Sequence, residues 1–396
     1  MIGHFFPDFG MALRPVGDGF IRLIKMIVVP IVFSTIVIGA AGSGSMKNGS
    51  LSIKTIIWFE VITTLVLGLG LLLANVLKPG VGLDLSHLAK KDIHELSGYT
   101  DKVVDFKQMV LDIIPTNIID VMARNDLLAV IFFAILFGVA AAGIGKASEP
   151  VMKFFESTAQ IMFKLTQIVM VTAPIGVLAL MAASVGQYGI ELLLPMFKLV
   201  GTVFLGLFLI LFVLFPLVGL IFQIKYFEVL KMIWDLFLIA FSTTSTETIL
   251  PQLMDRMEKY GCPKRVVSFV VPSGLSLNCD GSSLYLSVSC IFLAQAFQVD
   301  MTLSQQLLMM LVLVMTSKGI AAVPSGSLVV LLATANAVGL PAEGVAIIAG
   351  VDRVMDMART GVNVPGHAIA CIVVSKWEKA FRQKEWVSAN SQTESI

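Results

Sequence analysis

Four polar side chains share one face of an apolar segment near the end of the chain. Asp352, Asp356, Arg359 and Asn363 recur at intervals of three or four residues, which places them on one stripe of a helix. An arginine inside a membrane helix costs about 2.5–3.5 kcal/mol and therefore needs a partner. Because a guanidinium binds a carboxylate through two parallel hydrogen bonds, we expect Arg359 to bind a substrate carboxylate and Asp356 an ammonium group. The alternative is an internal salt bridge between Asp356 and Arg359 that only neutralises buried charge.

A second polar cluster interrupts the apolar stretch 264–297. Asn278 and Asp280 precede Gly281, and an unwound helix at this point frees backbone carbonyl oxygens. Carbonyl oxygens and a carboxylate together suit a hard cation, so we predict a coupling-ion site here, with sodium as a possible metal at Asp280. A simple helix kink with a capped aspartate is the alternative interpretation.

Further polar residues lie in apolar segments elsewhere. Glu60, with Thr63 and Thr64 one turn later, is either an intramembrane carboxylate or a residue at the membrane boundary. His367 lies two turns beyond Arg359; a lone histidine is usually a satisfied core residue, but its titration near physiological pH makes proton coupling conceivable. The residues predicted for the coupling ion or proton are Asp280, Asn278, Cys279, Gly274, Ser276, Ser317, Thr63, Thr64, Glu60, His367 and Asp352.

The composition places these residues in a polytopic membrane protein. Of 396 residues, 57% are hydrophobic and 14% charged, whereas soluble domains carry about 25% charged residues. A net charge of +1 argues against nucleic acid as a partner, and four widely spaced cysteines fit neither a disulfide framework nor a zinc site. Long uncharged stretches predict ordinary spanning helices at 26–46, 61–77, 127–145, 165–190 and 199–222.

Beyond residue 223 the apolar segments become short. The halves of 227–258 and of 303–340 are too short to cross a bilayer, so each predicts a re-entrant helical hairpin. One hairpin precedes the broken helix 264–297 and the other precedes the charged helix 342–378, which is the layout of an inverted repeat. The polar hairpin tips would hold the remaining carboxylate of a substrate.

Lysine and arginine residues predict which connections face the cytoplasm. They mark the connections near 47–54, 146–153, 225–231 and 256–265 and the tail after 376, whereas the links 185–190 and 298–302 carry none. The first hairpin therefore enters from the cytoplasm, the second from outside, and the C-terminus is cytoplasmic. Residues 79–104 form an external loop, followed by a surface helix near 106–114, and residues 386–396 form a cytoplasmic tail.

Several motifs, in the same order along the chain, resemble the dicarboxylate/amino acid:cation symporter family, which has the glutamate transporter fold. The stretch 242–251 is similar to the serine-rich tip of its first hairpin, and Asn278-Cys-Asp-Gly-Ser282 is similar to its Asn-Met-Asp-Gly-Thr motif. The family's second hairpin, last helix and early helix resemble residues 317–326, 352–363 and 23–30. The resemblance covers nearly the whole chain and is closest to bacterial members that couple glutamate and aspartate to protons.

The resemblance implies a substrate site around Arg359, which would bind the side-chain carboxylate, and Asp356, which would bind the amino group. Relatives for C4-dicarboxylates tend to lack this aspartate, and relatives for neutral amino acids tend to lack this arginine. The presence of both indicates glutamate or aspartate. The substrate-binding residues that the resemblance implies are Arg359, Asp356, Thr360, Asn363, Ser282, Thr246, Ser245, Val323 and Ser327.

The resemblance also implies an all-α fold with inverted repeats, two re-entrant hairpins and a broken helix, assembled as a homotrimer in the bilayer. Residues 1–54 and 105–186 would form a static scaffold for trimerisation. Residues 55–78 and 190–385 would form a mobile transport core, with the second hairpin as its outer gate. The first helix of the family is missing here, so we expect the natural chain to be longer.

Two departures from the family pattern bear on coupling and gating. His367 stands where sodium-coupled relatives have a cation-binding aspartate, and Cys279 stands where they have a methionine. Imidazole and thiol suit sodium poorly, which favours proton coupling. Ala322 and Ser325 replace glycines that are usual in the second hairpin tip, and the loss of backbone freedom would stiffen the gate.

We therefore predict a secondary active symporter, without cofactor or enzymatic activity, that takes up L-glutamate and L-aspartate with protons or sodium across a bacterial inner membrane. A C4-dicarboxylate symporter of the same fold is the main alternative. An intramembrane protease using Asp280 and Asp356 would have its paired carboxylates, but the usual Gly-x-Gly-Asp setting is absent at Asp280. A substrate-gated anion leak or a sensor is the third alternative.

Overall fold

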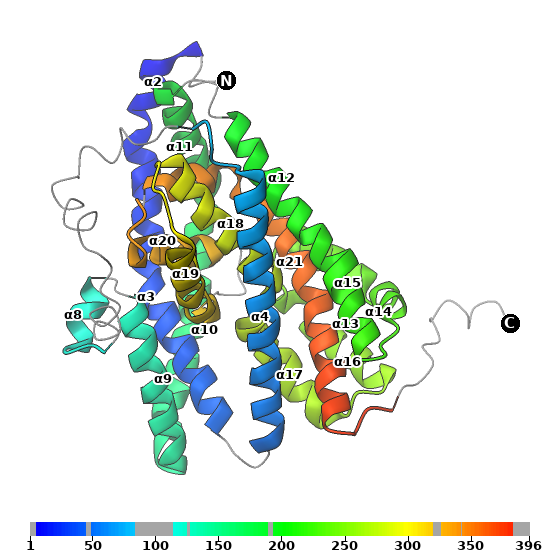
Figure 1. Cartoon of the computed structure of the whole chain (residues 1–396). Helices are drawn as coiled ribbons and strands as arrows, with labels where there is room; N and C mark the ends of the chain where they lie inside the picture. The colour runs from blue at the N-terminus through cyan, green and yellow to red at the C-terminus, as the bar shows by residue number, and fades with distance from the viewer. Residues whose placement is uncertain are drawn as a thin grey trace, which may run out of the picture.

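The protein consists of long helices that run between two ends of the molecule (Figure 1). The structure is a computed structural model that describes residues 5–44, 49–83, 114–124, 127–188, 193–319, 326–341 and 343–382. These ranges contain helices and short connections and no strand, so the predicted all-α class is confirmed. Three predictions lie wholly or mostly outside them: the surface helix 106–114, the loop 79–104 and the tail 386–396.

The first half of the chain supplies the long helices. In chain order these are α2 (Pro7–Ala12), α3 (Arg14–Gly44), α4 (Gly49–Leu77), α8 (Ile118–Ala123), α9 (Leu127–Gly143), the short η2 (Gly145–Ser148), α10 (Glu149–Val171), α11 (Ala173–Tyr188), α12 (Leu193–Leu209), the π-helical η4 (Ile210–Leu214) and α13 (Phe215–Ile221).

The second half supplies shorter, interrupted helices and one long final helix. They are α14 (Tyr226–Met232), α15 (Trp234–Thr243), η5 (Glu247–Ile249), α16 (Leu250–Tyr260), α17 (Lys264–Leu277), α18 (Asp280–Ala296), α19 (Leu303–Thr316), η6 (Ser317–Gly319), α20 (Gly326–Ala337) and α21 (Glu343–Trp377).

Three helical stretches in the described residues are long and apolar enough to cross a membrane: Ser50–Leu77, Leu193–Ile221 and Lys264–Ala296. The most apolar windows of the first two are only 44% and 39% buried, which leaves apolar surface for lipid, whereas that of the third is 94% buried. The third stretch contains the predicted break between α17 and α18. Protein therefore encloses the interrupted helix, which is the condition under which broken backbone is tolerated in a membrane.

The prediction of a single spanning helix over 165–190 is wrong. The chain forms α10, which ends at Val171, and α11, which begins at Ala173. Pro174 has no amide hydrogen to continue the hydrogen bonds of α10, but its fixed φ suits the first turn of a new helix. The uncharged stretch therefore crosses a helix boundary, and α10 contains charged residues such as Lys153 and Lys164 that the prediction had excluded.

Polar residues interrupt the first predicted hairpin at its tip. α15 ends at Thr243, and Thr244 adopts a positive φ of 54° before η5 and α16 begin. The Arg256 guanidinium on α16 donates to the Asp235 carboxylate on α15 with an Nη2–Oδ2 distance of 2.6 Å. The chain therefore returns alongside itself.

The second predicted hairpin also returns on itself. α19 ends before η6, and the chain continues as α20 after an interval that lies outside the described residues. The hydroxyl oxygens of Thr316 on α19 and Thr334 on α20 lie 3.0 Å apart. Both segments are helical and neither is long enough to span a membrane, as the sequence predicted.

Two sets of helices pack around two different helices. α3 packs against α9, α10 and α11, whereas α21 packs against α15, α17 and α18, and α11 also contacts α21. α18 also contacts α4 and α12, which places the broken helix at the centre of the second set. The assignment of 1–54 and 105–186 to a scaffold and of 55–78 and 190–385 to a mobile core stays a prediction, and so does the inverted repeat.

One carboxylate joins the ends of three helices. Glu378, which follows α21, accepts hydrogen bonds from the Lys54 ammonium at 2.7 Å, the Ser50 hydroxyl at 2.9 Å and the Arg265 guanidinium at 2.7 Å. The hydrogen bond from Lys54 is the main reason why the pKa of Glu378 lies below its ordinary value. This Glu378 clasp holds together the beginning of α4, the beginning of α17 and the end of α21.

We predict that Glu378→Gln lowers the free energy of unfolding by about 1 kcal/mol, because it removes the charge from these hydrogen bonds. The depressed pKa means that the stabilisation is fully present above about pH 4.3 and is lost as the pH falls through the lower pKa of the folded state. Thermal unfolding in detergent at pH 7 and below pH 4 measures both effects, and the two proteins should converge at the lower pH.

The matched control is Glu228→Gln, which removes the exposed pair with Lys225. Both partners of that pair are more than half exposed, so this change should leave the midpoint of thermal unfolding nearly unaltered. Equal losses from the two substitutions would show that the Glu378 clasp contributes no more than an ordinary surface pair.

Candidate functional site

Arg359 lies in α21, is completely buried and faces two carboxylates. Its Nη1 donates to Asp352 Oδ1 at 2.7 Å and its Nη2 donates to Asp352 Oδ2 at 3.4 Å. Nη2 also lies 2.9 Å from Asp356 Oδ1. The Asp356–Arg359 salt bridge that the sequence analysis gave as the alternative is therefore present. The guanidinium forms its two parallel hydrogen bonds, however, with Asp352. One positive and two negative groups leave this triad with a net charge of −1.

The broken helix forms the opposite wall of the triad. The Tyr285 ring on α18 lies 4.1 Å from Arg359 Cζ, and such a desolvated cation–π contact contributes about 2 kcal/mol. Asn363 Oδ1 accepts a hydrogen bond from the Gly281 amide at 2.8 Å, which fixes the first turn of α18 to α21. Arg359 Nε has no hydrogen-bond partner among the described residues, so its N–H can donate to a ligand.

Two glycines allow these helices to approach closely. A Cβ atom at Gly281 would lie 2.4 Å from the Arg359 carbonyl oxygen, and one at Gly366 would lie 2.2 Å from Asp280 Oδ2. Ser282 and Thr360, predicted as substrate ligands, are both buried on these same two helices. The two glycines thus bring the backbones of α18 and α21 together around the predicted substrate and ion residues.

Asp280 and Asn278 lie at the break, and both are fully buried. Asp280 Oδ2 accepts a hydrogen bond from Asn278 Nδ2 at 3.1 Å, whereas Asp280 Oδ1 and Asn278 Oδ1 have no partner in the described part of the chain. Buried oxygens of this kind can be satisfied by a cation, a proton or a water molecule. The described residues contain no cluster of three His, Cys, Asp or Glu side chains that could hold a metal ion. Sodium at Asp280 would therefore depend on carbonyl, amide and hydroxyl oxygens.

The remaining residues predicted around the break do not all converge on Asp280. His367 is 1% exposed, and neither ring nitrogen has a hydrogen-bond partner within the described ranges. A Cβ at Gly274 would lie 2.7 Å from His367 Nδ1, so that glycine makes room for the imidazole. The Cys279 thiol donates to the Leu275 carbonyl, and Ser276 lies in the last turn of α17.

The tip of the first hairpin is bonded to the same turn of α21 that holds the triad. Arg353 Nη1, one residue after Asp352, donates to the Thr244 hydroxyl at 3.0 Å. Beside it, Thr246 is buried and Ser245 is half-buried. The substrate ligands predicted at this tip are therefore held near the turn of α21 that begins the charged stripe.

The second hairpin contributes Ser317 and Ser327, both buried; the Ser317 hydroxyl donates to the Val314 carbonyl. Val323, Ala322 and Ser325 lie outside the described residues. Lys318, next to Ser317, lies 3.3 Å from Glu60 and 3.1 Å from Thr63, so Glu60, whose side chain is 41% exposed, forms an ion pair with the second hairpin. Thr64 is exposed, and only Thr63 of the two predicted threonines takes part in this contact.

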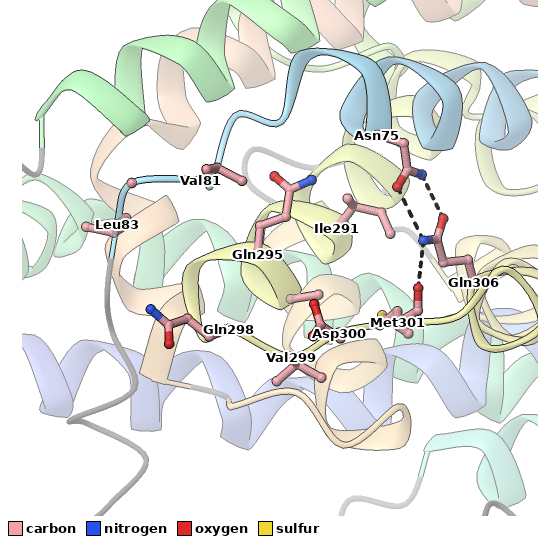
Figure 2. A pocket seen from close by; sticks show the side chains of 12 residues that line it. Asn75, Val81, Leu83, Ile291, Gln295, Gln298, Val299, Asp300, Met301 and Gln306 are labelled. Carbon is pink, nitrogen blue, oxygen red and sulfur yellow. Dashed lines mark hydrogen bonds between the residues drawn. The ribbon is translucent and has the colours of Figure 1, made fainter.

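A cavity of about 690 Å³ lies at the end of α4 opposite the Glu378 clasp. Figure 2 shows amide side chains on its wall, and the amides of Asn75 and Gln306 bond each other at 2.7 Å. None of the predicted substrate or ion residues lines it. The triad is thus separate from this cavity and is enclosed by its own ion pairs and by Tyr285.

Three residues of this site were not singled out from the sequence. Lys318 carried the same indication as Arg359, namely a cation within an apolar segment that needs a partner. Tyr285 carried none, because an aromatic residue in an apolar helix usually packs in the core. Arg353 was part of the family motif, but nothing in that motif showed its contact with the first hairpin.

The profile of the sodium:dicarboxylate symporter family matches residues 1–377. The chain belongs to the sodium:dicarboxylate symporter family. The predicted family is confirmed, and it is a family of membrane symporters rather than of enzymes. The buried carboxylates accordingly lie in a transporter, and Asp356 is paired with Arg359 rather than available as half of a protease dyad.

Relatives in this symporter family include carriers named for amino acids and for dicarboxylates. The chain is 99% identical to a proton/glutamate-aspartate symporter of Bacillus subtilis (strain 168), over 100% of this chain and 96% of the relative. It is 45% identical to the proton/glutamate-aspartate symporter of Escherichia coli (strain K12), over 94% of this chain and 87% of the relative. A C4-dicarboxylate transport protein of Bacillus subtilis (strain 168) is 40% identical over 98% and 93% of the two chains.

We predict that Gly281→Ala destabilises this symporter-family chain by about 1–3 kcal/mol, because the added methyl group would meet backbone atoms of Arg359 and cannot be accommodated by a side-chain rotation. The matched control is Gly201→Ala, since a Cβ at Gly201 meets nothing within 4 Å. Thermal unfolding in detergent compares the two variants. An unchanged midpoint for Gly281→Ala would contradict the close approach of α18 and α21.

Proposed function

We propose that this chain is a secondary active symporter that takes up L-glutamate and L-aspartate together with protons. The single observation that carries the proposal is the buried triad, in which one guanidinium faces two carboxylates beside a broken helix. The names of the relatives at 99% and 45% identity support the same substrates and the same coupling ion. No cofactor is required, because transport needs only binding and a change of access.

Substrate capture follows from exchange of carboxylates at Arg359. The side-chain carboxylate of glutamate or aspartate replaces Asp352 at the guanidinium fork, which binds carboxylates through two parallel hydrogen bonds. Asp356, then partly released from Arg359, pairs with the substrate ammonium. The hydroxyls of Ser282, Thr246 and Thr360 and the tips of both hairpins would bind the remaining carboxylate.

Charge balance at the triad gives a reason for proton coupling. Asp352 is 1% exposed, and a buried carboxylate that loses its cationic partner is costly to keep ionised. Asp352 therefore takes up a proton when the substrate displaces it from Arg359. The groups that face Asp352 are Arg359 and Asp356 on α21 and Tyr285 on α18. The empty triad carries a net charge of −1; the acidic amino acid adds one negative charge, and one proton restores −1. Substrate and proton then cross together without a change of buried charge.

Protons account for coupling better than sodium does. His367 and Cys279 supply a ring nitrogen and a thiol, which are poor ligands for a hard cation. The Cys279 thiol is already engaged with the Leu275 carbonyl. Some relatives are nevertheless named proton/sodium-glutamate symport proteins, such as that of Bacillus caldotenax at 46% identity. Uptake measured with and without sodium therefore belongs to the test of this proposal.

The same fold carrying a C4-dicarboxylate is the second candidate, because a relative named for that transport is 40% identical. A dicarboxylate has no ammonium group and would offer no cation to the buried Asp356 carboxylate. An acidic amino acid satisfies both Arg359 and Asp356. The geometry therefore favours the amino acid.

We further propose that the chain is a homotrimer in the bacterial inner membrane with a cytoplasmic C-terminus. The Glu378 clasp gathers Lys54, Arg265 and the end of α21 at one end of the molecule, which agrees with the placement of basic residues on the cytoplasmic side. The packing of α3 with α9 and α10 supports a scaffold beside the core around α21, with α11 in contact with both, and the second hairpin would be the outer gate.

Uptake by proteoliposomes tests the proposed substrate. With a pH gradient that is acid outside, the wild-type protein should accumulate labelled glutamate in sodium-free buffer, and unlabelled aspartate should compete better than succinate. Arg359→Ala should abolish this uptake, because it removes the guanidinium that would bind the side-chain carboxylate of the substrate. Asp356→Ser should reduce amino acid uptake by at least about tenfold while affecting succinate less.

Lys198→Ala, an exposed lysine on α12, is the control for loss of a positive charge. Full glutamate affinity in Arg359→Ala would refute the substrate assignment. Equal losses for glutamate and succinate in Asp356→Ser would contradict its role as the ammonium partner.

We predict that Asp352→Asn uncouples glutamate binding from protons, because the amide cannot take up the proton that the wild-type carboxylate needs on losing Arg359. Glutamate affinity of the wild-type protein should rise as the pH falls from 8 to 5.5, whereas that of the variant should stay nearly constant. Binding of labelled glutamate to purified protein measures this. A variant that keeps the wild-type pH dependence would place the coupling proton elsewhere, with His367 as the next candidate.

A further inference from the structure

The ammonium group of Lys318 occupies the break between α17 and α18. Lys318 lies in η6, at the beginning of the second hairpin tip, and its side chain is 13% exposed. It donates to the carbonyl oxygen of Leu277, the last residue of α17, at 3.0 Å. A neutral side chain could also fill the space at this break. The positive charge of Lys318 therefore calls for an explanation other than packing.

The partners of Lys318 match the number of its donors. An ammonium group has three hydrogens, and three oxygens surround Nζ: the Leu277 carbonyl at 3.0 Å, the Thr63 hydroxyl at 3.1 Å and a Glu60 carboxylate oxygen at 3.3 Å. A carbonyl, a hydroxyl and a carboxylate are also the kinds of ligand that hard cations bind in proteins.

The Leu277 carbonyl is available because the helix is broken. In a continuous helix it would accept from the amide of Gly281, but that amide donates to Asn363. Carbonyl oxygens at the end of a helix carry partial negative charge and attract cations. The interruption of α17 and the hydrogen bond to Asn363 therefore leave an oxygen that Lys318 satisfies.

The charges around the break also require a cation. Glu60 pairs with Lys318, and the buried Asp280 interacts electrostatically with it. Without Lys318, the Glu60 carboxylate and the Leu277 carbonyl at the end of α17 would lose the cation that both contact. Negative groups left without a cation beside the buried Asp280 attract a free cation or destabilise the break.

We infer that Lys318 is a cation fixed to the protein that replaces a free monovalent cation at the break between α17 and α18. The consequence of this inference for coupling rests on the proposed symport. Because the ammonium group of Lys318 in the second hairpin fills this position, glutamate uptake needs no sodium ion there. Removal of the Lys318 side chain should open a sodium site formed by Thr63, Glu60 and the Leu277 carbonyl.

Binding of ²²Na⁺ to purified protein in detergent tests the inference without any transport. The wild-type protein should show no saturable binding, whereas Lys318→Ala should bind about one sodium ion per chain, and Lys318→Ala combined with Thr63→Val should bind markedly less. Lys264→Ala removes an exposed lysine from the beginning of the same α17 and should behave as the wild type.

Uptake connects the site to coupling. Glutamate uptake by Lys318→Ala should be about tenfold faster in sodium chloride than in choline chloride, whereas the wild-type rates should be equal, because a bound cation and substrate typically couple by factors of 5–150. If the wild-type protein takes up no glutamate, the proposed function fails while the ²²Na⁺ result still decides the inference.

The inference would be overturned if the wild-type protein bound ²²Na⁺ saturably and Thr63→Val abolished this binding. That result would show that free sodium can enter the position. The inference would also be overturned if the Lys318→Ala protein elutes as a folded protein in size-exclusion chromatography but binds no sodium. If Lys318→Ala does not fold, the wild-type and Thr63→Val proteins decide. Absence of saturable binding in the wild type, or binding that Thr63→Val leaves unchanged, supports a position already filled, and wild-type binding that Thr63→Val abolishes overturns the inference.

Discussion

The burial of one guanidinium constrains the rest of this structure. Arg359 is completely buried in α21, and a charge in such surroundings must be compensated within hydrogen-bonding distance. Asp352 and Asp356 supply that compensation from the same helix, and Tyr285 covers the guanidinium from α18. The compensation exceeds the charge by one carboxylate. The triad therefore carries a net charge of −1, which the proposed symport would keep constant by taking up one proton with each acidic amino acid.

A site for a charged substrate within the bilayer also requires broken helices. Backbone groups of a continuous helix are all used internally, whereas the break after Leu277 leaves the Gly281 amide for Asn363 and the Leu277 carbonyl for Lys318. Protein must then enclose the interruption, and the α17–α18 stretch is the most buried of the three apolar helical stretches long enough to span. Glycine at 281 permits this enclosure, because any side chain there would meet the backbone of α21.

The two buried cations differ in what surrounds them. Arg359 contacts two carboxylates, and in the proposed mechanism the substrate replaces one of them, Asp352. Lys318 has three oxygens for its three hydrogens and is joined to a different element, the second hairpin. The first arrangement suits a binding site, and the second suits a permanent replacement for a bound ion. Both interpretations depend on how many hydrogen-bond donors each cation has and how many acceptors surround it, and not on the sign of the charge alone.

The sequence by itself determined the all-α class, the family, the broken helix and the charged stripe on the last helix, because each is a local pattern: apolar length, an interrupting Asn-Cys-Asp-Gly, and a spacing of three or four residues. It failed at the boundary between α10 and α11, where uncharged residues continue across Thr172 and charge carries no information on where a helix ends. Only the tertiary structure showed that Arg359 pairs in two points with Asp352, that Tyr285 covers it, and that Lys318 reaches α17 and Glu60. Those contacts join residues on different helices or select one carboxylate from two on the same face, and neither spacing nor composition encodes such a choice.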